Sequence, residues 1–316
     1  MTTSIADVGE FPLIDRLTAD LALGPAVSVG PGDDGAVFLV DNRAVSSIDT
    51  YVEGVHFRRD WCAAGDVGRK AVAATVADIE AMGAQPVSLM VAFAAPGDLP
   101  ADWALELAAG LKEECAKARI NLVGGDVSSA RDITLSLAAI GELGGREPVL
   151  RSGARPGDVL ALRGRLGWAA AGLAALRRGF RSPRAVVKAY QCPLPPYGAG
   201  AEAAIFGASA MIDISDGLLA DLGHIAQASD VTIDLDSSRL EVAEPIQAVS
   251  QATGRPPLEF VLTGGEDHAL AAAFPFGQVP GGWTVIGRVQ DPAGSPPTVL
   301  VDGQFWGGPA GWTHFR

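Results

Sequence analysis

Gly32-Asp33-Asp34-Gly35 and Asp213-Ile214-Ser215-Asp216-Gly217 are two acidic turns flanked by glycine, about 180 residues apart. The sequence contains no lysine-bearing phosphate loop of the P-loop kind. Asp49 and Asp126 follow apolar runs, and Asp78 lies in an alanine-rich segment. Carboxylates that come together in a fold repel one another unless cations lie between them. The pattern therefore indicates chemistry that depends on bound metal ions.

The composition of these acidic segments favours a hard cation. Few His or Cys residues stand near the acids, so oxygen-seeking Mg²⁺, Mn²⁺ or Ca²⁺ is expected rather than Zn²⁺. The spacing of a calcium loop is missing, which favours Mg²⁺ that bridges to a substrate phosphate. Taken singly, an Asp-Gly pair is a common turn, and Asp216 before an apolar helix is a common cap. The set of acids as a whole favours metal binding.

Length and charge limit the class of protein. With 316 residues and 48% hydrophobic composition, the chain can bury a sizeable core in about two domains, with one large domain as the alternative. The net charge of -13 is concentrated in residues 1–150, which hold 22 acidic and 11 basic residues. A surface of this sign repels nucleic acid and anionic membranes. We therefore expect neither as a partner.

The cysteines and the apolar runs indicate a cytoplasmic protein. Cys62, Cys115 and Cys192 are odd in number and far apart, which predicts neither a disulfide framework nor a zinc site. The first residues mix acids with apolar residues, unlike a signal peptide. The apolar runs are about half the roughly 20 residues that a membrane span requires.

Hydrophobic periodicity predicts a mixed order of strands and helices. Strands are expected at 38–40, 44–48, 87–94, 133–140, 158–162, 260–263, 268–274, 284–289 and 298–301, and helices at 67–82, 101–118, 166–178 and 218–228. Asp49 and Asp126 are expected at strand ends, and Ser215-Asp216-Gly217 is expected to cap the helix at 218. The Gly/Pro/Arg-rich stretch 144–157 predicts a boundary between domains 1–148 and 149–316.

A short sequence similarity, called the echo below, occurs between the two halves of the chain. Residues 122–126 (Leu-Val-Gly-Gly-Asp) and 262–267 (Leu-Thr-Gly-Gly-Glu-Asp) share the order of apolar residues, two glycines and an acid. If both segments end a strand, two related α/β units are one interpretation. Common turn chemistry after a strand is the other.

The motifs taken together resemble the thiamine-monophosphate kinase family, from near residue 30 to the C-terminus. The segments that carry the resemblance are 32–34, Asp49-Thr50 with Val52 to Phe57, 78–84, 124–126, 213–218 with 220–225, 264–267, and the ending Gly311-Trp312-Thr313-His314-Phe315. The wider superfamily of aminoimidazole-ribonucleotide synthetase and selenophosphate synthetase shares the acids. It lacks the Glu-Gly-Val-His-Phe and Gly-Trp-x-His-Phe segments.

This resemblance implies ATP-dependent phosphorylation of thiamine monophosphate to thiamine diphosphate, by direct in-line transfer assisted by several Mg²⁺ ions. It implies a two-domain α/β (α+β) fold of the aminoimidazole-ribonucleotide synthetase type, with mixed sheets flanked by helices. A homodimer formed through the N-terminal domains and a site between the domains are also implied. The implied metal ligands are Asp34, Ser47, Asp49, Asp78, Asp126, Asp213 and Asp216. Nucleotide contacts would be Gly125, Asp126, Arg151 and Ser215, and substrate contacts His56, Glu266 and Trp312.

The chain departs from the family pattern in places, and other functions stay open. Ile48 stands where Thr is frequent, His268 replaces a more usual Tyr-Glu continuation, and Ser128 stands in a segment that commonly has Thr after the acid. The alternatives are another ATP-using enzyme of the superfamily and a non-catalytic binder of nucleotide or thiamine phosphate. A calcium-stabilised structural protein ranks last.

Overall fold

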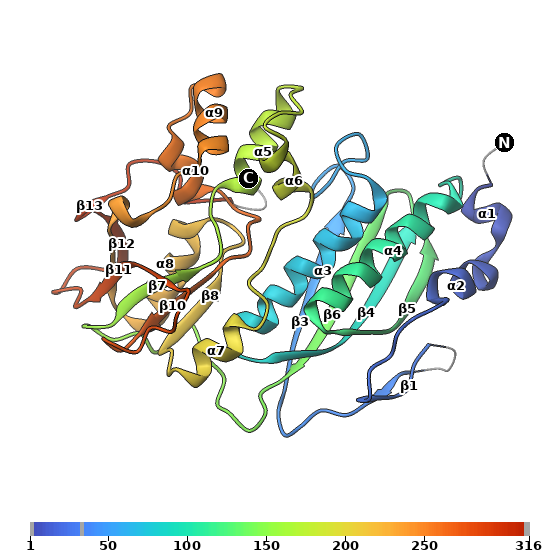
Figure 1. Ribbon diagram of the computed structural model, residues 1–316, viewed down its shortest axis with the longest axis horizontal. Helices are drawn as coiled ribbons and strands as arrows, with labels where there is room; N and C mark the ends of the chain where they lie inside the picture. Colours follow the sequence, from blue (N-terminus) through green and yellow to red (C-terminus); the bar gives the residue numbers. More distant parts are fainter. Residues whose placement is uncertain (1–2, 32–34, 313–316) are drawn as a thin grey trace. The chain divides into compact units, whose positions relative to one another are not determined.

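The computed structural model describes residues 3–31 and 35–312, and it divides the chain into two compact units (Figure 1). Unit 1 comprises Met1–Ile79 and Gln85–Gly145, and unit 2 comprises Glu80–Ala84 and Arg146–Arg316. Both contain helices and sheets, and the sheets mix parallel and antiparallel strands. The predicted α/β class with mixed sheets flanked by helices is confirmed.

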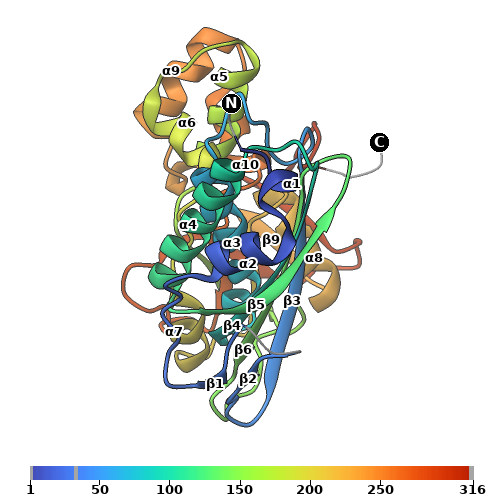
Figure 2. The ribbon, with the colours of Figure 1, turned by 90° about the vertical axis from the view of Figure 1, so that its right-hand side faces the viewer.

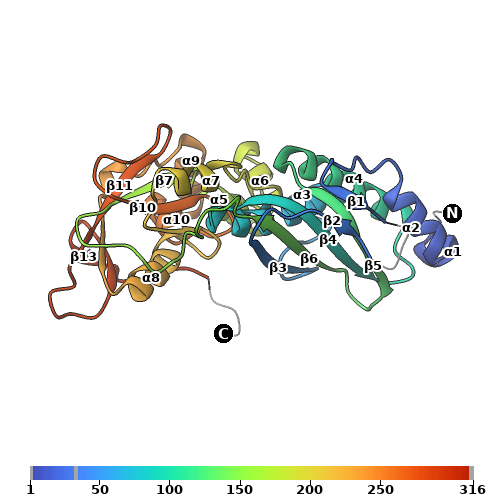
Figure 3. The same cartoon turned by 90° about the horizontal axis from the view of Figure 1, so that it is seen from below.

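Unit 1 is built on a four-stranded sheet in the order β3-β6-β4-β5, with a small β1-β2 ribbon. Its elements are α1 (Ile5–Val8), α2 (Glu10–Thr18), β1 (Val27–Val29), β2 (Val37–Phe38), β3 (Ala44–Val52), α3 (Ala64–Ala81), β4 (Gln85–Ala95), α4 (Ala101–Ala118), β5 (Asn121–Ser129) and β6 (Thr134–Glu142). Helices α3 and α4 lie on one face of this sheet (Figures 2 and 3).

The register of the sheet assigns each side chain to a face. Across β3, β6 and β4, the rows Asp49–Leu137–Val91 and Tyr51–Leu135–Phe93 are buried, apart from the half-buried Asp49, and so belong to the face that the helices cover. Side chains alternate along a strand, so their neighbours belong to the opposite face. Ile48 belongs to that opposite face and is 69% exposed.

Three glycines let α3 and α4 pack with their backbones almost in contact. A Cβ atom on Gly110 would lie 2.1 Å from the Gly65 carbonyl oxygen, and one on Gly68 would lie 2.4 Å from the Leu107 carbonyl oxygen. Neither helix backbone can retreat easily, because each helix is packed on the sheet below it. Only glycine fits at these crossings.

Unit 2 is built on a seven-stranded sheet in the order β13-β12-β9-β11-β7-β10-β8. Its elements are β7 (Val159–Arg163), α5 (Trp168–Arg177), α6 (Arg184–Gln191), α7 (Ala199–Ile205), β8 (Ala210–Asp213), α8 (Leu218–Ser229), β9 (Thr232–Leu235), the 3₁₀ turn η1 (Ser237–Arg239), α9 (Glu244–Thr253), α10 (Pro257–Thr263), β10 (Leu270–Phe274), β11 (Thr284–Gln290), β12 (Thr298–Val301) and β13 (Gln304–Phe305). The β9–β12 pair is parallel, and the other pairs are antiparallel.

Apolar side chains cover both faces of this sheet, which is why β8 and β10 are buried along their whole length and are apolar except for Asp213 at the end of β8. Leu160, Ile212 and Ile233 pack with α8 residues such as Leu222. Residues of the other face, including Phe274, pack with α7 and Trp283. Asp213 therefore ends a strand that is buried on both sides.

Three predictions about secondary structure are wrong. Residues 260–263 belong to helix α10, where Pro257 fits the first turn and the apolar residues pack inward. Asp49 and Asp126 lie inside β3 and β5 rather than at strand ends. Because residues 124–126 continue a strand while residues 262–263 end a helix, the echo between the halves joins unlike structures.

Helix α8 begins at Leu218, directly after the predicted capping segment, as predicted. Gly217 is the N-cap, and no side chain of the predicted capping segment closes the helix. Helices α6, α7, α9 and α10 and strand β9 were not predicted, because each is short or lies in a segment rich in small residues. Among the described residues, no helix combines the length and apolar character that crossing a membrane requires.

The crossing of α3 and α4 leads to a stability prediction. Gly110→Ala places a methyl group against the Gly65 backbone, and we expect this overpacking to destabilise the protein by about 1–3 kcal/mol. Gly223→Ala is the matched control, since Gly223 is helical and has open space around its Cβ position. It should stabilise by about 0.5–1 kcal/mol through helix propensity. Urea unfolding followed by circular dichroism measures both, and equal stability of the two variants would contradict the crossing.

Candidate functional site

Three predicted metal ligands of unit 1 come together between strand β3 and helix α3. Ser47 Oγ donates a hydrogen bond to Asp78 Oδ2 at 2.5 Å. Asp49 lies two residues along β3, on the same helix-covered face as Ser47, and its Oδ2 accepts from Tyr51 Oη at 3.5 Å. All three side chains are half-buried at the edge of the sheet. The alanine-rich stretch of α3 lets Asp78 approach the strand closely.

Gly125 and Asp126 belong to a different part of the same sheet. Asp126 pairs across the strands with Ala92, which pairs with Ser136, so its side chain belongs to the face opposite Asp49. Gly125 has a packing reason of its own, because a Cβ atom there would lie 1.9 Å from the Val91 carbonyl oxygen. Asp34, the remaining predicted ligand in the first half, lies outside the described residues.

His56 follows β3 in a tight turn, and the turn fixes its tautomer. Its Nδ1 accepts the backbone N–H of Val52 at 3.0 Å, so in the neutral ring the proton is on Nε2. The ring contacts Tyr51 edge-on, with centroids 5.8 Å apart. The backbone oxygen of His56 accepts from the buried Lys70 ammonium at 3.4 Å. His56 can therefore donate an Nε2–H to an anion.

In unit 2, the segments 213–217, 264–268 and 311–312 form one group of loops. Asp213 is buried at the end of β8, and its Oδ2 lies 3.1 Å from His268 Nδ1. Ser215 O accepts the Glu266 N–H at 2.8 Å, and Asp216 O accepts the Trp312 N–H at 2.9 Å. The structure thus brings together five predicted residues: Asp213, Ser215, Asp216, Glu266 and Trp312.

Tight backbone contacts hold these loops in place. A Cβ atom on Gly265 would lie 2.3 Å from the Ser215 carbonyl oxygen, so the two loops meet without side chains between them. Glu266 and His268 both have positive φ values, 67° and 52°, which are uncommon for residues with side chains. With this backbone conformation, residues 266–268 run along the Ser215 turn, and strand β10 begins at Leu270 rather than at the predicted residue 268.

Asp221 is an additional acid of this group. Its Oδ2 accepts the backbone N–H groups of Ser215, Asp216 and Gly217 at 3.0, 3.1 and 3.0 Å. Burial, together with the negative charge of Asp213, raises the pKa of Asp221 to about 7, while the N–H donor of Gly217 opposes the shift. The carboxylates therefore lie close enough to repel one another.

Asp267 joins the same loops to helix α5. Its two carboxylate oxygens accept the N–H groups of Trp168 and Ala169 at 3.1 and 2.9 Å, and so cap the helix across about 100 residues of sequence. Burial raises the pKa of Asp267 to about 7, while the N–H donor of Ala169 and the positive charge of Arg165 oppose the shift. Asp267 supports the backbone that carries Glu266.

Arg151 lies apart from this group of loops. Its carbonyl oxygen accepts the Ser229 hydroxyl at 3.0 Å, and Ser229 is the last residue of α8. Ser215 precedes the first residue of the same helix, and 12 helical residues span about 18 Å. Unit 2 therefore separates the backbone of Arg151 from that of Ser215 by the length of α8.

The acids fit a hard cation, but they do not form a complete cage. In the part of the chain that the structure describes, no three Asp, Glu, His or Cys side chains come together as a metal cluster. The donors near Asp78 and Asp216 are mainly oxygen atoms, which Mg²⁺ prefers. Mg²⁺ typically uses one or two carboxylates and completes its shell with water and substrate phosphate. The observed arrangement suits that mode.

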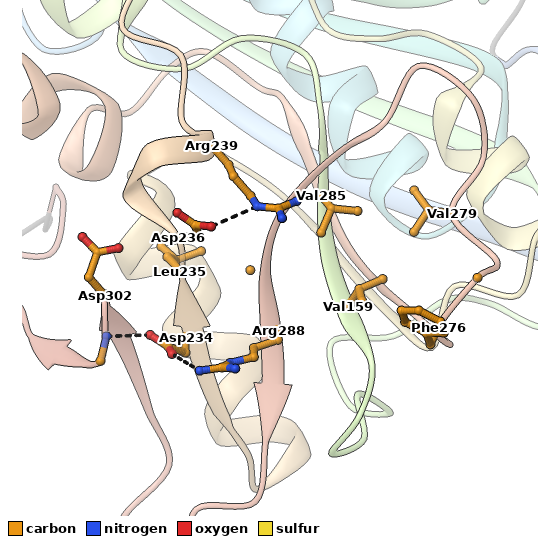
Figure 4. Close-up of a pocket in the computed structure, with 13 residues that line it drawn as sticks. Val159, Asp234, Leu235, Asp236, Arg239, Phe276, Val279, Val285, Arg288 and Asp302 are labelled. Carbon is orange, nitrogen blue, oxygen red and sulfur yellow. Dashed lines mark hydrogen bonds and ion pairs between the residues drawn. The ribbon is translucent and has the colours of Figure 1, made fainter.

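A cavity of about 820 Å³ occurs elsewhere in unit 2, on strands β7, β9 and β11 and the loop after β10 (Figure 4). The residues of the acidic loops do not line it. Its two arginines are paired with acids, Arg239 with Asp236 at 2.9 Å and Arg288 with Asp234 at 3.1 Å. The loops around Asp213, and not this cavity, bring together the predicted metal and substrate residues of unit 2.

Asp221, Asp267 and His268 are functional candidates that the sequence motifs contain but did not single out. Each acts through a residue that is distant in sequence or through backbone N–H groups. For Asp221, the available signal was an acid in the first turn of a helix that follows an acidic turn. For Asp267 and His268, no local signal indicates the distant partner.

The chain matches two family descriptions. Residues 32–143 match the AIR synthase related protein, N-terminal domain, and residues 155–294 match the AIR synthase related protein, C-terminal domain. Together these matches cover most of the chain. The predicted aminoimidazole-ribonucleotide synthetase type of fold is thereby confirmed.

Several known proteins are similar along nearly the whole chain. A thiamine-monophosphate kinase from Mycobacterium tuberculosis is 49% identical over 314 residues, which is 99% of this chain and 93% of the relative. The crystal structure of thiamine-monophosphate kinase from Stenotrophomonas maltophilia K279a is 30% identical, has a TM-score of 0.81, and matches 94% of this chain and 97% of its own. A structure described as AaThiL complexed with AMPPCP and TMP is 30% identical, with a TM-score of 0.79 and full coverage of both chains. The chain therefore belongs to the thiamine-monophosphate kinase family, within the AIR synthase related proteins.

Proposed function

We propose that this protein transfers the γ-phosphoryl group of ATP directly to thiamine monophosphate, in line, with several Mg²⁺ ions, to form thiamine diphosphate. The 49% identity to a thiamine-monophosphate kinase over 99% of the chain carries the proposal. A second relative, AaThiL, has a structure described as complexed with AMPPCP and TMP. This supports a nucleotide and a thiamine phosphate as the two substrates.

The acids are assigned as Mg²⁺ ligands on chemistry and on the family resemblance. In unit 1 these are Ser47, Asp49 and Asp78, with Asp34 and Asp126 kept from the resemblance. In unit 2 they are Asp213 and Asp216. Bound Mg²⁺ would neutralise phosphate charge and align the reacting oxygens. The residues around these acids hold them in fixed positions, as the hydrogen bond from Ser47 to Asp78 illustrates.

The acceptor needs no general base. A phosphate monoester has a second pKa of about 6, so thiamine monophosphate is largely dianionic at neutral pH. The obstacle is repulsion between the acceptor and the nucleotide, which positive charge and hydrogen-bond donors relieve. His56 suits the donor role, because Nδ1 already accepts from Val52 and Nε2 carries the proton. Gly125, Arg151 and Ser215 are the proposed nucleotide contacts.

Phosphorus NMR tests the reaction and the role of the acids together. With ATP, Mg²⁺ and thiamine monophosphate, we expect signals of ADP and of a diphosphate ester to appear. Asp78→Asn keeps an oxygen that can accept from Ser47 but removes the charge, so turnover should fall about 10²–10³-fold. Asp98→Asn changes an exposed loop acid and is the control, with unchanged turnover expected.

Each alternative function gives a different spectrum. Loss of ATP without thiamine diphosphate would indicate another acceptor within the superfamily. Unchanged ATP together with measurable ligand binding would indicate a non-catalytic binder. A phosphorylated Asp or His trapped during turnover would contradict direct transfer, and full activity after chelation of Mg²⁺ would contradict the role of the metal.

Selection of thiamine monophosphate is assigned to Trp312 and Glu266 beside the acidic turn. Trp312 is anchored by a hydrogen bond from its backbone N–H to Asp216 O, and the residue is 55% exposed. An aromatic face attracts the cationic thiazolium, and a carboxylate can accept from the aminopyrimidine. Glu266 reaches the same turn through its own N–H.

Trp312→Ala should therefore raise the KM for thiamine monophosphate about tenfold, equivalent to ~1.4 kcal/mol, and leave the KM for ATP nearly unchanged. Steady-state kinetics with each substrate varied measures the difference. Phe305→Ala is the control, because Phe305 is another exposed aromatic residue near the end of the chain. Equal changes in both KM values would remove Trp312 from the substrate site.

The open face of the unit 1 sheet is the proposed dimer interface. Ile48, Ala138, Met90 and Gly124 form one row across its four strands, and Ile48 is 69% exposed on the edge strand β3. A half-apolar sheet face of this kind is usually covered in the native assembly. The homodimer implied by the family resemblance offers an identical sheet as the cover.

Ile48→Glu should convert the dimer to a monomer, because it buries a carboxylate in the proposed interface. Light scattering after size-exclusion chromatography should give about twice 32.4 kDa for the unmodified protein and about 32.4 kDa for the variant. Phe276→Glu changes an 86% exposed residue of unit 2 and should leave the mass unchanged. A dimer that survives Ile48→Glu would place the interface elsewhere.

A further inference from the structure

Asp221 makes an unusual set of hydrogen bonds for a helical residue. Its backbone N–H donates to Gly217 O at 2.9 Å as a normal helix bond. Its side chain turns back, and one oxygen, Oδ2, accepts the three successive N–H groups of residues 215–217. The residue is only 3% exposed. The N–H groups of the turn that leads into helix α8 are thus satisfied by the protein's own carboxylate.

These bonds decide which atoms of the turn can meet a ligand. The N–H of Ser215 binds Asp221, and its carbonyl accepts from Glu266. The N–H of Asp216 also binds Asp221, and its carbonyl accepts from Trp312. Both backbone groups of each residue therefore have partners within the protein. The N–H groups of these two residues are therefore not available to a ligand, and the Ser215 hydroxyl and the Asp216 carboxylate are the side-chain groups that can meet a metal or a nucleotide.

The geometry argues against Oδ2 of Asp221 as a metal ligand. Three N–H groups surround Oδ2, and a cation at that oxygen would face their positive ends. Loss of the carboxylate would leave three N–H groups of a largely buried turn without their acceptor, which a compact fold avoids. The Ser215 turn, and the Glu266 and Trp312 segments bonded to it, would then lose their common support.

We infer that Asp221 is a positioning residue that fixes the 215–217 turn, so that the side chains of Ser215 and Asp216, and with them Glu266 and Trp312, stand ready for metal and substrate. This inference rests on the proposed function. It adds a residue that holds the proposed metal-binding residues in place and does not itself bind the metal. The carboxylate oxygen matters as an acceptor, and its charge is secondary.

Two variants separate the acceptor from the charge. Asp221→Asn keeps an oxygen that can accept all three N–H groups, while Asp221→Ala removes it. Mn²⁺ serves as the probe, because its binding can be measured by electron paramagnetic resonance without substrate turnover. We expect Asp221→Ala to weaken Mn²⁺ binding about tenfold, and Asp221→Asn to stay within about threefold of the unmodified protein.

Hydrogen exchange supplies a readout that a general loss of stability would not reproduce. In Asp221→Ala, the amides of residues 215–217 should exchange at least tenfold faster, while strands β7 and β10 keep their protection. Faster exchange throughout unit 2 would assign Asp221 to the stability of the fold and overturn the inference. So would unchanged exchange at 215–217, or equal loss of Mn²⁺ binding in the Asn and Ala variants.

Further variants keep the outcome decisive. If Asp221→Ala does not fold, Asp221→Glu carries the test: it keeps the charge, moves the oxygen by one methylene, and should weaken Mn²⁺ binding where Asp221→Asn does not. Unchanged binding in Asp221→Glu would overturn the inference. Asp216→Asn checks the proposed function separately. If Asp216→Asn binds Mn²⁺ normally, the metal assignment fails, and the exchange at 215–217 still decides the role of Asp221.

Discussion

The three hydrogen bonds to Asp221 Oδ2 are the interaction on which the acidic loops of unit 2 depend. These bonds satisfy the N–H groups of residues 215–217. The carbonyl oxygens of Ser215 and Asp216 accept hydrogen bonds from two other segments, those of Glu266 and Trp312. A single buried carboxylate thereby organises residues that are almost 100 positions apart. Asp267 acts in a similar way, because its carboxylate accepts backbone N–H groups at the start of α5 and so joins its loop to that helix.

Electrostatic repulsion is a property that the clustered acids share. Burial and neighbouring negative charge raise the pKa of Asp221, so this group of carboxylates costs free energy as long as its charge is uncompensated. Under the proposed function, cations bound between these acids and the ATP phosphates would supply the compensating charge. The excess of acids in residues 1–150 agrees with this dependence, because the net charge offers little attraction to a bare polyanion.

The long elements and the mixed α/β class could be predicted from the sequence, because their signals are local. The apolar periodicity around Val72 and Val76 predicts a helix, and α3 contains that segment. The apolar run 260–263 is too short to distinguish a strand from a buried helix, and tertiary packing decided for the helix.

The candidate site was predictable only in part. Acidic motifs and the family resemblance identified Ser47, Asp78 and the Asp213–Asp216 segment. The strand register that directs Asp126 to the opposite face from Asp49 depends on pairing across the sheet, which no local pattern contains. The role of Asp221 was hidden for a related reason, since its partners are backbone groups and leave no trace in residue type.

Crowding at Gly125 and Gly265 affects how mutational data on this family should be interpreted. Each glycine faces a carbonyl oxygen so closely that any side chain would displace a neighbouring strand or loop. A deep mutational scan scored by growth would find both positions intolerant, and an alignment would show them as invariant. Neither result would distinguish a nucleotide contact from a steric limit, so ligand assignments at such glycines need binding measurements on folded variants.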